Sequence, residues 1–178
     1  MKNFCKACLA LLPLSLYAQQ PDEELISWSS SKRLTWSDYK ATPDPGSDAA
    51  ASTTTYLMIS YNISDEHFGF KIESKFSRTR SWGLYKTAYI LSHEQGHFDI
   101  AEIFARKLNK KMKDYVFNKR TYQKELKKIY QDILDEKEEW QNRYDKETNH
   151  SINKDKQAEW LKKIANMLDE YKAYAGYQ

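Results

Sequence analysis

Residues 81–108 read SWGLYKTAYILSHEQGHFDIAEIFARKL, and a long helical pattern runs through them. Apolar residues recur at helical spacings from Leu84 to Met112. This periodicity predicts a single helix over roughly 83–116, and Ser81 is well placed to cap its first turn. The fold then depends on which other elements of the chain pack against this helix.

Two further helical patterns follow, over about 121–144 and about 153–174. Each has an apolar stripe at spacings of three, four or seven residues, and charged residues fill the remaining faces. The polar segment DKETNHSIN, residues 145–153, connects them. Such a helical hairpin would return the chain to the beginning of the long helix.

The first half of the chain has the pattern of a sheet. Residues 53–64 are rich in β-branched and aromatic side chains, and residues 67–76 alternate apolar with polar side chains, so an antiparallel hairpin with one buried face is predicted. Shorter strand-like pieces occupy 25–28 and 34–36, and the Pro- and Gly-containing loop 41–52 separates them from the hairpin. We therefore predict an α+β domain, a small antiparallel sheet packed on a long helix plus a C-terminal helical hairpin.

The N-terminus has the order of a secretory signal peptide, with lysines, an apolar run of about 11 residues and a small residue before a polar segment. Cleavage is predicted after Ala18, giving a signal peptide over 1–18 and one domain over 19–178. The apolar run is too short to cross a bilayer, and no stable membrane insertion is expected. The protein is expected to be periplasmic or secreted.

Charge and cysteine content narrow the classes of partner and of metal ligand. The formal charge is +3, and loss of Lys2 and Lys6 with the signal peptide would leave +1, so nucleic acid is not an expected partner. Both cysteines, Cys5 and Cys8, lie inside the signal peptide. A transition metal would therefore need His, Asp, Glu or water as ligands.

The segment HEQGHFDIAE, residues 93–102, places His93 and His97 four residues apart on the predicted helix. Side chains at this spacing share one helix face, so both imidazoles can reach one ion. Glu94 follows the first histidine, as in the H-E-x-x-H arrangement of zinc hydrolases. In that chemistry zinc activates water and the glutamate acts as general base. We predict a zinc site here, against the alternative of ordinary polar residues on a helix surface.

A catalytic zinc normally has three protein ligands and a water, so a third ligand is needed. The metzincin pattern is excluded because isoleucines stand three and six residues after His97. Glu102 lies about 140° around the helix from His97, and Asp99 about 200°. Both are expected to anchor neighbouring groups instead. In the connection between the last two helices, His150 and Glu147 are the remaining candidates.

The residues resemble a bacterial family catalogued as domain of unknown function 922 and described as predicted secreted zinc-dependent proteases. Four features carry the likeness: LTWSDYKATP near the N-terminus, the stretch that contains the H-E-x-x-H motif, YDKETNHSINKDKQAEW near the C-terminus, and the export signal. Many members have glycine where this chain has Ser151.

The resemblance implies a zinc peptidase with a zincin-like fold. By position, His93, His97 and His150 become the zinc ligands, Glu94 becomes the general base, and Asp145 and Thr148 would orient the connection or the His150 ring. The expected substrate is a peptide or protein. The alternative is a non-enzymatic exported module that binds metal or protein and keeps the same fold.

Overall fold

The computed structural model describes residues 24–64 and 67–177. The predicted signal peptide over 1–18, with Cys5 and Cys8, lies outside these ranges. Within them the strands form a three-stranded antiparallel sheet of order β1-β4-β3 and a separate two-stranded ribbon of β2 with β5. Their bounds are β1 Leu25–Ser27, β2 Ala51–Ser52, β3 Thr55–Ile63, β4 Phe68–Ser77 and β5 Trp82–Gly83.

The long hairpin of β3 and β4 follows the predicted alternation. Its register runs from the Thr55–Phe76 pair to the Ile63–Phe68 pair. Ile72 and Phe76 are fully buried, whereas Lys71 is exposed, so one face of the sheet belongs to the core. The hairpin predicted from period-two alternation is confirmed.

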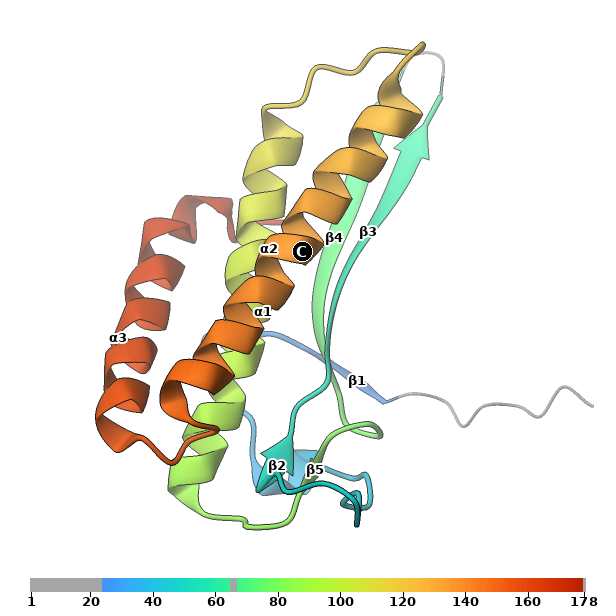
Figure 1. Cartoon of the computed structure of the whole chain (residues 1–178). Coiled ribbons are helices and arrows are strands. Elements are labelled where there is room, and N and C mark those ends of the chain that lie inside the picture. Colours follow the sequence, from blue (N-terminus) through green and yellow to red (C-terminus); the bar gives the residue numbers. More distant parts are fainter. Residues whose placement is uncertain (1–23, 65–66, 178) are drawn as a thin grey trace, which may run out of the picture.

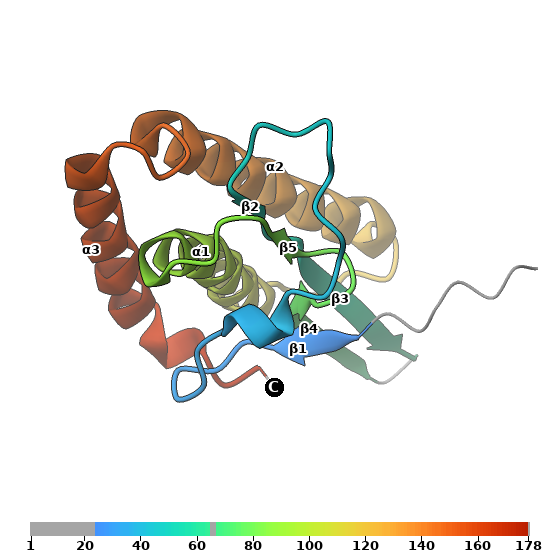
Figure 2. The ribbon, with the colours of Figure 1, turned by 90° about the horizontal axis from the view of Figure 1, so that it is seen from below.

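Three long helices of the described residues lie on that side of the sheet: α1 (Ala88–Lys113), α2 (Tyr122–Thr148) and α3 (Lys154–Glu170). Helix α1 lies at the centre, because it contacts the sheet on one side and both α2 and α3 on the other (Figure 1; Figure 2). Its residues Ile100, Ile103 and Phe104 have no exposed surface. The α+β class, with a small antiparallel sheet and three helices, agrees with the prediction.

Two local predictions were wrong. Residues 34–36 form no strand, because the backbone N–H of Leu34 donates to Gln95 Oε1 on α1 (2.8 Å) and a 3₁₀ turn starts at Trp36. The long helix begins at Ala88 and is capped by the Thr87 side chain, not by Ser81. Residues 82–83 pair with β2 instead, which ends the helical pattern early.

No helix among the described residues has an apolar stretch of the length that a bilayer crossing requires.

Candidate metal centre

The H-E-x-x-H residues lie near the start of α1, on a part of the helix that is covered by other elements. His93 and Glu94 are 3 % and 4 % exposed, and the side chain of His97 is 13 % exposed. The two imidazole Nε2 atoms are 3.3 Å apart. The one-turn spacing predicted from the sequence therefore brings both rings to a common point.

The third member of this cluster is Asp145, on the last turns of α2. Its Oδ1 lies 3.1 Å from His93 Nε2 and 3.0 Å from His97 Nε2. His93, His97 and Asp145 are the group of side chains in the described part of the chain that could hold a metal ion. The resemblance gave Asp145 an orienting role, so its direct contact with both histidines is new information.

The spacing of the three donor atoms fits a small tetrahedral metal site. With metal–ligand bonds of about 2.0–2.1 Å, neighbouring ligands of a tetrahedron are about 3.3 Å apart. The observed separations are 3.3, 3.1 and 3.0 Å. Imidazole nitrogen and carboxylate oxygen are also ligand types that zinc accepts in catalytic sites. The donor set and its dimensions fit zinc.

Gln141, one turn before Asp145 on α2, fixes the orientation of the His97 ring. His97 Nδ1 donates to Gln141 Oε1 (2.5 Å), and Gln141 Nε2 donates to the backbone carbonyl of His97 (2.9 Å). This contact places the proton on Nδ1 and directs the free Nε2 toward Asp145, as partners of metal-binding histidines commonly do. His93 Nδ1, in contrast, is buried without a hydrogen-bond partner among the described residues.

Tyr144 fixes the other ring and sets the approach of the two helices. Its ring stacks on His93 with centroids 4.4 Å apart, and its hydroxyl donates to the His93 carbonyl (3.2 Å). A Cβ on Gly96 would lie 2.6 Å from that hydroxyl. Gly96 therefore leaves the space in which Tyr144 crosses α1.

Glu94 points into the same region and is held by a separate pair of hydroxyl groups. The Thr53 hydroxyl donates to Glu94 Oε2 (2.6 Å), so the Tyr39 hydroxyl, 2.9 Å from Thr53 Oγ1, acts as donor to Thr53. Burial, together with the charge of Glu94, raises the pKa of Tyr39 well above its ordinary range, which keeps its proton in place. One carboxylate oxygen of Glu94 is thus fixed by the Thr53 hydroxyl.

The pKa values of His97 and Asp145 indicate that the cluster favours a positive charge between its side chains. Burial alone would lower the pKa of His97, but the hydrogen bond and charge of Asp145 raise it to about 9. Burial would raise the pKa of Asp145, but its hydrogen bonds to both histidines hold that pKa well below its usual range. In the absence of a metal, a proton on His97 therefore provides the positive charge between these groups.

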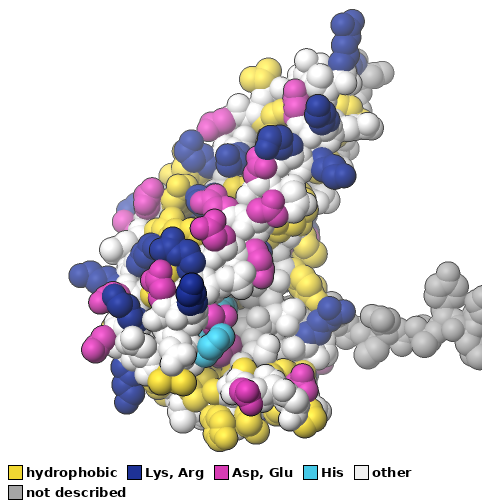
Figure 3. Space-filling view, viewed as in Figure 1, with side chains coloured by type: hydrophobic (Ala, Val, Ile, Leu, Met, Phe, Trp, Pro, Cys, Tyr) yellow, Lys and Arg dark blue, Asp and Glu magenta, His cyan; other side chains and the backbone are white. Residues whose placement is uncertain are grey.

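A cleft of about 560 Å³ opens over the cluster. Residues 49–55, including β2 and the start of β3, form one wall, and α2 forms the other. In the space-filling view, histidine and acidic side chains gather where the helices meet the β2–β5 ribbon (Figure 3). The candidate metal centre is therefore accessible from solvent.

His150 lies at the edge of this cleft. Its side chain is 69 % exposed, and its Nδ1 is 3.7 Å from Asp145 Oδ1. Asn149, His150 and Ser151 all have positive φ, at 48°, 50° and 73°. This backbone region favours glycine. His150 stays a prediction as a ligand, because the structure places it beside the three-donor cluster and not within it.

The other sequence candidates have different partners. Glu147 accepts from Trp160 Nε1 (2.8 Å) and from Arg143. Glu102 accepts from Arg106 Nε (2.7 Å) and from the Tyr177 hydroxyl. Both carboxylates are thus used to join elements of the fold.

Asp99 joins the N-terminal segment to α1. It accepts from Trp28 Nε1 (2.8 Å) and forms a two-bond ion pair with Arg33 (3.0 and 2.6 Å). The expectation that Asp99 and Glu102 anchor neighbouring groups agrees with these contacts.

An α+β fold with a partly buried His–His–Asp group and an adjacent glutamate in an open cleft defines a candidate metalloprotein. The chain belongs to the family described as bacterial protein of unknown function (DUF922), whose model matches residues 15–151. This match confirms the resemblance and includes the whole donor cluster. Comparisons with curated proteins and with solved structures gave no match.

Proposed function

We propose that this protein is an exported zinc-dependent metallohydrolase that cleaves peptide bonds. The observation that supports the proposal best is the triangle of His93 Nε2, His97 Nε2 and Asp145 Oδ1, with sides of 3.0–3.3 Å, next to Glu94 in an open cleft. His93, His97 and Asp145 would hold the zinc, and His150 is the additional ligand that the sequence predicts.

Zinc in this position would lower the pKa of a water molecule toward about 7 and polarise a substrate carbonyl. Glu94 then serves as general base: it takes a proton from the attacking water and returns it to the leaving amine. The Thr53 hydroxyl keeps one carboxylate oxygen of Glu94 in place, so the other oxygen remains available for this proton. Thr53 is thus the positioning residue and Glu94 the general base.

The free edge of β2 and β3 offers a way to align an extended peptide. These strands pair with β5 and β4 on one side, and residues 49–55 line the cleft. A peptide that lies along such an edge can form main-chain hydrogen bonds as an additional strand. By analogy with zincins, this arrangement would carry the scissile bond past the metal centre.

Glu94→Gln tests the proposal. The purified mature protein is loaded with zinc and incubated with a library of peptides from digested bacterial proteins, and mass spectrometry identifies new termini. Cleavage should fall about 10²- to 10⁴-fold in the variant, while zinc content measured by mass spectrometry stays at the wild-type level. Glu139→Gln, an exposed change on α2, is the matched control and should cleave normally.

Two outcomes would contradict this assignment in different ways. Equal cleavage by wild type and Glu94→Gln would remove Glu94 as the base. Tight zinc binding by a wild type that cleaves no peptide would favour the alternative function, an exported metal-binding module without catalysis.

A further inference from the structure

Lys137 is a covered lysine in the wall of the candidate catalytic cleft. Its side chain is only 12 % exposed, whereas the other lysines of α2 (Lys124, Lys127, Lys128 and Lys146) are exposed. Burial accordingly lowers its pKa, with only a partial opposing effect from Glu138. A lysine in this setting normally has an anionic partner, because an uncompensated buried charge is costly.

The described part of the chain provides no hydrogen-bonded anion for this ammonium group. The nearest carboxylate is that of Glu138, with Nζ and Oε2 3.9 Å apart, which is beyond hydrogen-bonding distance. Two other covered lysines differ: Lys75, 20 % exposed, lies 3.1 Å from a Glu73 oxygen, and Lys107, 16 % exposed, donates to Glu136.

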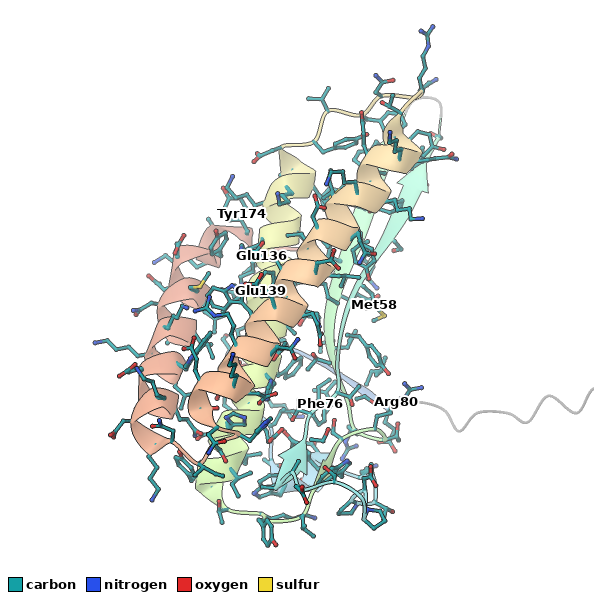
Figure 4. The ribbon with its side chains drawn as sticks, in the orientation of Figure 1. Met58, Phe76, Arg80, Glu136, Glu139 and Tyr174 are labelled. Carbon is teal, nitrogen blue, oxygen red and sulfur yellow. The ribbon has the colours of Figure 1, made fainter. Side chains whose placement is uncertain are left out.

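The carboxylates that flank Lys137 in sequence compensate its charge only in part. Glu136 binds Lys107 of α1, and Glu136 and Glu139 lie on the side of α2 toward α1 and α3 (Figure 4). Glu138 is 65 % exposed to solvent. Lys137 and Glu138 both line the cleft, so the ammonium group has only this solvent-exposed carboxylate near it there.

Lys137 continues the row of α2 side chains that forms the metal centre. Lys137, Gln141 and Asp145 follow one another at four-residue intervals, and all three line the cleft. Eight helical residues advance about 12 Å along the axis. An extended peptide covers that length in roughly three or four residues, so Lys137 lies within reach of a substrate whose scissile bond is at Asp145.

We propose that Lys137 binds a carboxylate of the substrate, so that the protein selects peptides with a negative charge roughly three or four residues from the scissile bond. This inference rests on the proposed peptidase function. The carboxylate has two possible sources, an Asp or Glu side chain or a free C-terminus. Either would give the covered ammonium the hydrogen-bonded anion that it lacks.

The test compares wild type, Lys137→Met and Lys137→Glu on the same peptide library. Wild type should cleave mostly where a carboxylate stands at a fixed distance on one side of the scissile bond. Lys137→Met keeps the length and apolar stem of the side chain and should lose this preference, with kcat/KM on carboxylate-containing peptides about 10- to 100-fold lower, mainly through KM. Lys137→Glu should reverse the preference toward Lys or Arg.

Matched peptides separate the two sources of the carboxylate. A pair that differs only by Glu or Gln at the selected position tests the side chain, and a pair that differs only by a free or amidated C-terminus tests the chain end. Lys146→Met, an exposed change on the same helix, should keep the wild-type preference. Zinc content and melting temperature of each variant show whether the fold and metal centre are intact.

Failure of this inference differs from failure of the proposed function. Cleavage by wild type without any carboxylate preference, or the same preference in Lys137→Met, overturns the role of Lys137 and leaves the peptidase proposal standing. Absence of cleavage by zinc-loaded wild type overturns both.

Discussion

The two faces of α1 carry polar side chains of similar kinds. On one face the hydrogen-bond acceptors have donors, and on the other they lack them. On one face, Glu102 accepts hydrogen bonds from Arg106 and the Tyr177 hydroxyl, so acceptors meet donors. On the other face, His93 and His97 direct nitrogen atoms at a single carboxylate oxygen of Asp145. Because neutral His97 uses its Nδ1 proton on Gln141, its Nε2 is an acceptor, and this nitrogen meets the Asp145 carboxylate favourably only around a proton or a metal cation.

The comparison shows how to separate a structural polar cluster from a ligand site. Burial and short distances are common to both faces, so neither property identifies function. The difference is that the α1–α2 face has too few protons for its acceptors, while the face toward Tyr177 has enough. Variants on the first face should therefore change metal affinity, and variants on the second should change the free energy of unfolding.

The largest effect is expected for Asp145→Ala. Structural zinc sites bind their metal with a free energy of about 10–16 kcal/mol. Since the variant loses one of three protein ligands, zinc affinity should fall on the order of 1,000-fold. Competition with a chromophoric zinc chelator measures this change. His150→Ala is the paired variant: a smaller loss there than in Asp145→Ala supports Asp145 as the third ligand, and the reverse order would restore the sequence prediction.

Arg106→Met breaks the compensated face and should leave the metal centre unchanged. Removing one partner of a buried ion pair costs about 3–5 kcal/mol. We expect a value near 3 kcal/mol, because burial already raises the pKa of Glu102 and the unpaired carboxyl can take up a proton. Urea unfolding of the metal-free protein measures the loss, and zinc affinity should stay within about twofold of wild type.

The control for this change is Lys128→Met, since the Lys128–Asp132 pair is exposed on both sides. Its unfolding midpoint should match that of wild type, because exposed ion pairs contribute little. A loss of zinc in Arg106→Met comparable to that in Asp145→Ala would mean that the two faces are not independent.

Gln141→Leu tests the contact that orients His97. Loss of such a partner typically lowers metal affinity 10- to 100-fold, and we expect that range here because the Nδ1 donor would be left without its acceptor. Gln141→Glu keeps an oxygen for Nδ1 and should recover most of the affinity. Equal zinc affinity in wild type and Gln141→Leu would show that Tyr144 and Asp145 alone are sufficient to hold the rings.

The sequence predicted elements that depend on local pattern. Alternation in 67–76 indicated the β3–β4 hairpin, and helical spacing indicated all three helices. The errors fall where a side chain of another element decides the backbone. Gln95 of α1 binds the Leu34 N–H where a strand was expected, and Trp36 packs so closely against Gly83 that a Cβ there would lie 2.5 Å away.

The candidate site likewise has one part that local sequence pattern predicts and one part that depends on how the helices pack. His93, Glu94 and His97 are related by helix geometry alone, so their proximity was predictable. The contact of Asp145 with both histidines depends on two facts that no local spacing contains. Helix α2 continues to Thr148, beyond its predicted end at 144, and Tyr144 packs into the space at Gly96, which sets the rotation of α2 against α1.

The smallest expected effect is the change of zinc affinity with each pH unit. It tests whether a proton takes the place of the metal in the cluster. Because Asp145 raises the pKa of His97 to about 9, zinc must displace a proton from His97 at neutral pH. Affinity should therefore rise about tenfold per pH unit between pH 7 and 9 and then level off. Asp145 should not titrate in this range, since its pKa is held well below its ordinary value.

The stability of the metal-free protein should show the opposite trend with pH. The folded pKa of His97 exceeds its ordinary value of 6.5, so its contribution to stability is complete below about pH 6.5 and is lost as the pH rises through about 9. Calorimetry in two buffers of different ionisation enthalpy counts the protons released when zinc binds. Release of about one proton at pH 7.5 is expected. Release of none would mean that His97 is already neutral, and the histidine–aspartate cluster would then lack the protonic charge that distinguishes it from the Glu102 face.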